Sequence, residues 1–172
     1  MGRLADAVKT RTELAKMEVL ATGKMTIDEN IHLCTSLFGK PAECIYYPNM
    51  YRGIDTSGTA MLLYEDFQVQ AIAAKDTWGE NFVQIEGEKG YIYCTGSSSC
   101  LDEIKVVTRQ ETAVYNEQTT TDRWYYEIIR LVPLLLREDR QELQCRKTVT
   151  LNTVEVMENA RLAAGIRFPG DE

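Results

Sequence analysis

The sequence predicts an α+β domain, in which an open, mainly antiparallel β-sheet carries helices packed on one face. The stretch from Gly53 to Cys94 contains closely spaced runs rich in Val, Ile, Tyr, Phe and Thr, with joints as short as Glu65-Asp66. Such spacing is typical of antiparallel hairpins. Helix-forming segments precede and follow these runs, and 172 residues suit one domain.

Two helices are expected before the sheet. Residues 4–22 have helix-forming composition without Pro or Gly, and Gly23 can end that helix in a left-handed conformation. A second helix is predicted over 28–38, where Asp28 can cap its start. The Gly39-Lys40-Pro41 segment ends it, since proline cannot continue a helix.

The sheet itself should follow directly. Strands are predicted over 42–50, 56–64, 67–75, 81–86, 91–94, 101–108 and 113–115, with a loop over 95–99. Within 67–75, Phe67, Val69, Ala71 and Ala73 alternate with Gln68, Gln70, Ile72 and Ala74. Neither set is charged, so we expect both faces to be covered, one by helices and the other by a second domain or subunit.

Two further helices are expected after the sheet. The first spans 123–137 and should bury Trp124, Ile128, Leu131 and Leu135, with Pro133 kinking or interrupting it. Residues 138–140 are polar and turn-like. The last helix should span 148–164 and bury Val149, Thr153, Val156, Met157 and Ala160, before a tail that folds Ile166 and Phe168 back onto the domain.

Bulk composition disfavours several classes of function. A net charge of −7 opposes nucleic-acid binding, which needs a basic surface. No apolar run approaches the ~20 residues of a membrane span, and the N-terminus lacks the apolar segment of a signal peptide. Five scattered cysteines are typical of reduced thiols in a cytoplasmic protein, and a single histidine makes a zinc site improbable, so no metal is expected.

Few residues can carry chemistry. No glycine-rich phosphate-binding turn occurs, so no cofactor-binding residues are expected in this chain. Asp28 and His32 are four residues apart, which places a carboxylate beside an imidazole on one helical face, as a general base requires. The competing interpretation is that Asp28 caps the helix and His32 packs at its edge. Lys75 and Asp76 end a strand, where they could contact a substrate or form a surface ion pair.

Several segments, in order, resemble one known family. HLCTSLFGKPAEC, RGIDTSGTAMLLYEDFQVQAIAAKD, QIEGEKGYIYCTG and VMENARLAAGIRFPGD are similar to the C-terminal domain of the Gfo/Idh/MocA family of NAD(P)-dependent oxidoreductases. The resemblance covers about 30–171 and implies an α+β substrate domain whose sheet also builds oligomers. It implies NAD or NADP as cofactor in a full-length member, bound by an N-terminal Rossmann domain that this chain lacks.

The resemblance also implies roles for particular residues. Asp28 and His32 match the spacing of the family's proton-transferring Asp and His, whereas another register puts Met25 and Glu29 in those places. We therefore divide the chain into an N-terminal helix (1–24) and an oxidoreductase C-terminal domain (25–172).

The expected function follows from this division. The chain should be the substrate-binding and oligomerisation domain of an oxidoreductase acting on a sugar or polyol hydroxyl, inactive in isolation, with Lys75 and Asp76 contacting the substrate. Its expected partners are a small-molecule substrate and further copies bound through the sheet face. The alternative is a non-catalytic oligomeric sheet module.

Overall fold

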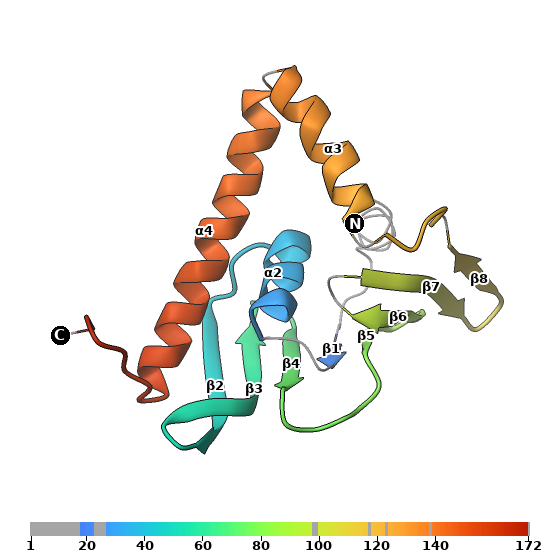
Figure 1. Cartoon of the computed structure of the whole chain (residues 1–172). Helices are drawn as coiled ribbons and strands as arrows, with labels where there is room; N and C mark the ends of the chain where they lie inside the picture. The colour runs from blue at the N-terminus through green and yellow to red at the C-terminus, as the bar shows by residue number, and fades with distance from the viewer. Residues whose placement is uncertain are drawn as a thin grey trace.

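The chain folds as one sheet with helices on a single side. The computed structural model describes residues 18–22, 27–97, 100–116, 118–122, 124–137 and 139–171. Its strands are β1 (Glu18–Thr22), β2 (Glu43–Tyr51), β3 (Ile54–Leu63), β4 (Gln68–Ala74), β5 (Phe82–Gly87), β6 (Gly90–Ser97), β7 (Cys100–Thr108) and β8 (Thr112–Tyr115), and its helices are α2 (Ile27–Phe38), α3 (Tyr125–Leu136) and α4 (Arg140–Ala163). The strand order is β2-β3-β4-β1-β5-β6-β7-β8, and all strand pairs except β1–β4 are antiparallel (Figure 1). The predicted fold class is confirmed.

Strand β1 lies in the middle of the sheet. It runs parallel to β4 and antiparallel to β5, so that Leu20 lies opposite both Gln70 and Gln84. The helix predicted over 4–22 is therefore wrong for residues 18–22, and residues 4–17 lie outside the described part of the chain. Helix propensity is a weak preference, and pairing with two neighbouring strands overrides it.

The other strands follow the predicted order along the chain. β2, β3 and β4 form one antiparallel meander, and β5 to β8 form a second. The loop predicted over 95–99 is shorter than expected, because β6 continues to Ser97 beyond a bulge at Thr95/Gly96. Gly96 has a φ of 87°, and a Cβ at this position would overlap the carbonyl oxygen of Cys100. Glycine therefore permits the bulge.

Side chains alternate across the sheet as the sequence predicts. On the helix-bearing face, Leu62, Val69 and Ala71 are fully buried, and they share one apolar core with Ile31 of α2 and Val156 of α4. Burial of each large aliphatic side chain contributes about 1.5–3 kcal/mol. This core fixes α2 and α4 on the same face of the sheet.

Helix α4 is longer than predicted. It begins at Arg140 rather than at 148, because Asp139 caps it by accepting a hydrogen bond from the backbone N–H of Glu142 at 3.1 Å. Asp139, from the segment that the sequence predicts as a turn, supplies this cap. Thr153, Val156 and Ala160 are buried, as predicted.

Helix α3 shows the opposite of its predicted burial. Trp124, Ile128, Leu131 and Leu135 are 41–58% exposed, whereas Leu134 is buried. The helix also continues through Pro133 without interruption. Figure 1 gives the reason for the exposure: α3 lies apart from the sheet, so that no core is available to its apolar face.

An ion-pair clasp holds the C-terminal tail against α4. Ile166 is buried, as predicted, whereas Phe168 stays exposed and lies under the Arg161 guanidinium at 4.5 Å. Arg161 donates two hydrogen bonds to the Asp171 carboxylate, at 2.6 and 3.0 Å. These bonds, together with one from the backbone N–H of Phe168, lower the pKa of Asp171 to about 2.

We predict that Asp171→Asn lowers the thermal stability at pH 7. Because the pKa of the folded-state carboxyl is lowered, its contribution is present above the ordinary value of 3.8 and is lost as the pH falls towards about 2. Melting temperatures measured from pH 2 to 7 should therefore converge for the two proteins at the acid end. Asp66→Asn, in the exposed β3–β4 turn, is the control. If the curves of melting temperature against pH stay parallel for Asp171→Asn and the unchanged protein, the Arg161–Asp171 ion pair does not stabilise the fold.

Candidate functional site

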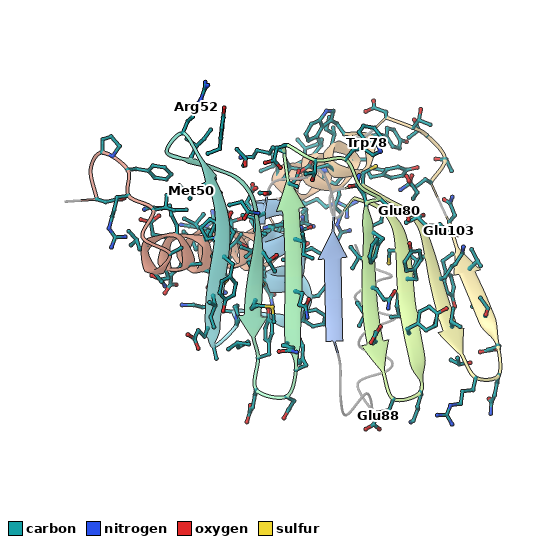
Figure 2. The ribbon with its side chains drawn as sticks, turned by 90° about the horizontal axis from the view of Figure 1, so that it is seen from below. Met50, Arg52, Trp78, Glu80, Glu88 and Glu103 are labelled. Carbon is teal, nitrogen blue, oxygen red and sulfur yellow. The ribbon has the colours of Figure 1, made fainter. Side chains whose placement is uncertain are left out.

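The N-terminal half of α2 is fixed over β4 by a buried asparagine. Asn30 is 1% exposed, and its Nδ2 donates to the carbonyl oxygen of Ile72 at 3.1 Å. β1 and β4 are parallel, so the end of β1, which precedes α2 in the chain, and the end of β4, which leads into Lys75, lie at the same end of the sheet (Figure 2). The fold therefore brings the start of α2 towards the end of β4.

His32 lies at the contact between α2 and α4. Its Nδ1 is 3.4 Å from Oγ1 of Thr153, and this hydroxyl is 2.6 Å from Oγ1 of Thr35. Thr35 and Thr153 are both buried, whereas His32 is half-buried. The two threonines and the imidazole thus form one polar cluster between helices that are distant in the sequence.

The proton count of this cluster assigns the histidine tautomer. Thr35 Oγ1 is 3.1 Å from the carbonyl oxygen of His32, and Thr153 Oγ1 is 2.9 Å from that of Val149. The Thr153 contact with the Val149 carbonyl is the shorter of its contacts to a carbonyl and to the ring, so we assign the Thr153 proton to Val149. With this assignment Nδ1 carries a hydrogen and donates to Thr153, and Nε2 is the ring atom that can accept one.

Asp28 does not orient this imidazole. It lies in the first turn of α2 and is half-buried, but among the described residues no hydrogen bond or ion pair joins it to His32. The sequence correctly places the two residues four apart on one helix. Thr153 takes the orienting position that the spacing suggested for Asp28. In the alternative register, Glu29 lies in the same turn, and Met25 lies outside the described residues.

Lys75 and Asp76 directly follow β4, and both are exposed. The backbone N–H of Lys75 donates to the carbonyl oxygen of Thr56, and the Thr56 hydroxyl donates to Asp76 Oδ2 at 2.6 Å. Within the described residues, no ion pair joins Lys75 to Asp76. The Asp76 carboxylate is thus tied to the start of β3, and the exposed Lys75 precedes it directly.

The described helices do not fit a nicotinamide cofactor. A helix that receives a pyrophosphate needs an N-terminus without opposing negative charge. The first turn of α2 contains Asp28 and Glu29, that of α3 contains Glu127, and that of α4 contains Glu142. We therefore assign no cofactor-binding residues among them.

The cysteines are poor candidates for nucleophilic catalysis. Burial raises the pKa of Cys34 and Cys94 to about 12 and that of Cys44 to about 11, which keeps these thiols protonated near neutral pH. Cys100 is half-buried and Cys145 exposed, and none of the five forms a disulfide. The described residues contain no group of three or more His, Cys, Asp or Glu that could hold a metal.

Among the described residues, no helix is both long enough and apolar enough to cross a membrane.

Sequence comparisons give no match, whereas fold comparisons give many. No protein-family profile and no curated protein matches the chain. The fold is similar to that of the 3-ketoreductase KijD10 from Actinomadura kijaniata, solved with NADP (TM-score 0.64, 9% identity), and of the UDP-N-acetylglucosamine 3-dehydrogenase GnnA from Acidithiobacillus ferrooxidans (0.62, 11%). It is also similar to the WlbA dehydrogenase from Bordetella pertussis, solved with NADH and UDP-GlcNAcA (0.55, 14%).

The likeness extends over nearly the whole chain but only part of each neighbour. It covers 89%, 94% and 98% of this chain, and 55%, 60% and 61% of KijD10, GnnA and WlbA, respectively. At these identities the comparison establishes the fold. The fold is therefore similar to that of a part of each of these three proteins.

We predict that Thr153→Val abolishes the preference of His32 for the tautomer protonated on Nδ1, because valine cannot accept its hydrogen bond. The free energy of unfolding should fall by about 1 kcal/mol, the net contribution of one hydrogen bond. Long-range ¹H–¹⁵N spectra report the tautomer without ambiguity, since His32 is the sole histidine. Thr150→Val is the matched control, because Thr150 lies on the exposed side of α4 and makes the same bond to the carbonyl four residues earlier. An unchanged ring spectrum in Thr153→Val would refute the assignment.

Proposed function

We propose that this chain is the substrate-side and oligomer-forming domain of an NAD(P)-dependent oxidoreductase of the Gfo/Idh/MocA type, acting on a hydroxyl of a sugar or polyol. The observation that carries the proposal is the fold likeness along 89–98% of the chain to three sugar oxidoreductases, of which it spans 55–61%. A further portion of the enzyme would hold the cofactor and supply hydride transfer.

His32 is the residue proposed to move the proton of the substrate hydroxyl. With Nδ1 donating to the Thr153 hydroxyl, Nε2 would accept a proton from a substrate and return it. Asp28 would act through its charge at the start of α2, since it makes no hydrogen bond to the ring in the described part of the chain. Lys75 and Asp76 would bind substrate hydroxyls at the end of β4, where a cationic donor and a carboxylate acceptor are both exposed.

A second role, as an assembly module, is favoured by the face of the sheet that bears no helix. Figure 2 views this face, and the alternation places on it Ile45, Met61, Leu63 and Ile72, with the stacked rings of Phe82 and Tyr93 beside them. At the margins, Tyr47 and Tyr91 are 60% and 43% exposed. Large apolar side chains on an uncovered face favour a contact between subunits. Both roles can belong to one protein.

We predict that the isolated chain binds neither NAD(H) nor NADP(H) and has no dehydrogenase activity. The reason is that the first turns of α2, α3 and α4 are acidic and would repel a pyrophosphate. Calorimetric titration with each dinucleotide, with KijD10 as the positive control, tests this. Micromolar binding to the isolated chain would overturn the assignment of the cofactor to another portion.

Substitution of His32 distinguishes the catalytic role from the assembly role. If the chain is joined to a cofactor-binding portion that gives turnover, His32→Ala should abolish turnover under the first role and leave it unchanged under the second.

We predict that Met61→Glu together with Ile72→Glu reduces the number of chains in the assembly. The reason is that two charges buried in a contact through the sheet face would oppose that contact. Sedimentation velocity at several concentrations measures the mass. Val154→Glu, which adds a charge at a 56% exposed position of α4, should leave the mass unchanged. A strict monomer before substitution would exclude assembly through this face.

A further inference from the structure

Helix α3 presents a second apolar surface, which neither proposed role uses. Seven of its twelve residues are large apolar side chains that are 41–79% exposed, and we call them the α3 face: Tyr125, Ile128, Ile129, Leu131, Val132, Leu135 and Leu136. An amphipathic helix normally turns such residues to a core.

The α3 face is continuous. At 3.6 residues per turn, its seven residues occupy one arc of about 160°, with no charged residue inside it. The opposite side of the helix contains Glu127, Arg130 and Leu134. Arg130 lies 3.7 Å from Glu142 of α4, and Leu134 is buried, so the narrow side faces α4 and the broad apolar side faces outward.

Apart from the Arg130–Glu142 ion pair, α3 is joined to the rest of the fold by hydrogen bonds near its two ends. At its start, the Tyr126 hydroxyl accepts hydrogen bonds from the backbone N–H groups of Thr119 and Thr120. At its end, the carbonyl oxygen of Leu134 accepts from the N–H of Asp139, and from there α3 and α4 diverge (Figure 1). A twelve-residue helix is marginal in water without packing along its length. A surface that covers the α3 face would supply this packing.

The size and chemistry of the face define the partner that fits. Its exposed apolar area is on the order of 700 Å², close to the ~800 Å² that each partner contributes to a standard interface. It exceeds the patches of ~300–600 Å² that are usual on monomers. Since the face has no charge, it cannot select nucleic acid or an anionic membrane surface, which need cationic side chains. A matching apolar face is required.

We propose that a second copy of this chain covers the α3 face, with the two α3 helices antiparallel about a two-fold axis. A two-fold axis places the same surface on both sides of the contact, so the uncharged face meets its own complement. In this arrangement Ile128 of one copy lies near Leu135 of the other, and Val132 lies close to the axis. Helix α3 and the helix-free face of the sheet lie on opposite sides of the sheet (Figure 1), so a contact through α3 leaves that face of the sheet open.

The test uses a variant of the chain that already carries Met61→Glu and Ile72→Glu. In this background, assembly through the sheet face cannot contribute to the measured mass. Sedimentation velocity between about 1 and 100 µM covers the affinities expected of weak to strong interfaces of this size. This background should sediment as a dimer, and adding Ile128→Glu and Leu135→Glu should halve its mass. The control Ile54→Glu is matched, because Ile54 is 61% and Ile128 55% exposed, and it should leave the dimer intact.

A covalent readout complements the mass. Val132→Cys, combined with Cys145→Ser to remove the exposed thiol, should form a disulfide-linked dimer under mild oxidation, whereas Cys145→Ser alone should not. Circular dichroism verifies that each variant is folded. A background that remains a monomer at 100 µM, or a dimer that persists with both α3 charges present, would overturn the proposal. A monomer that sediments with neutral phosphatidylcholine vesicles would equally overturn it, by identifying a lipid surface as the partner.

Discussion

The pairing of β1 on both of its edges is the interaction on which the rest of the fold depends. Glu18–Thr22 pairs with β4 on one side and with β5 on the other. Without it, the β2–β4 and β5–β8 meanders would each present an unpaired inner edge, a row of backbone groups prone to association. Five residues therefore join two hairpin systems into one sheet, and the parallel β1–β4 pair sets the end of the sheet from which α2 begins.

The pairing of β1 also determines where α2 and its histidine lie. Because α2 follows β1, Asn30 can bind the carbonyl of Ile72 and fix the helix over β4. His32 then meets Thr153 of α4, which is 121 residues away in the sequence. The orientation of the one histidine is thus a product of packing between two helices, and no residue adjacent in the sequence supplies it.

Assembly surfaces arise from the one-sided placement of the helices. α2 and α4 cover one face of the sheet around Leu62 and Val69, so the alternate residues Met61 and Ile72 remain on the helix-free face. α3 reverses the usual arrangement, since its single buried residue, Leu134, lies on the side of its polar residues. Seven large apolar side chains on the exposed side of one helix are consistent with a contact between α3 and another molecule.

The sequence by itself determined the local elements, because short-range periodicity and turn chemistry decide them. The alternation of Val69 and Ala71 with Gln70, and the glycine and proline after Phe38, gave the α+β class, seven of the eight strands and the limits of α2. Only the tertiary structure decided what depends on distant partners: Glu18–Thr22 is a strand because β4 and β5 flank it, and Ile128 is exposed because no core reaches α3. Thr153 orients His32 for the same reason, since a hydrogen bond across 121 residues leaves no periodic signal in the sequence.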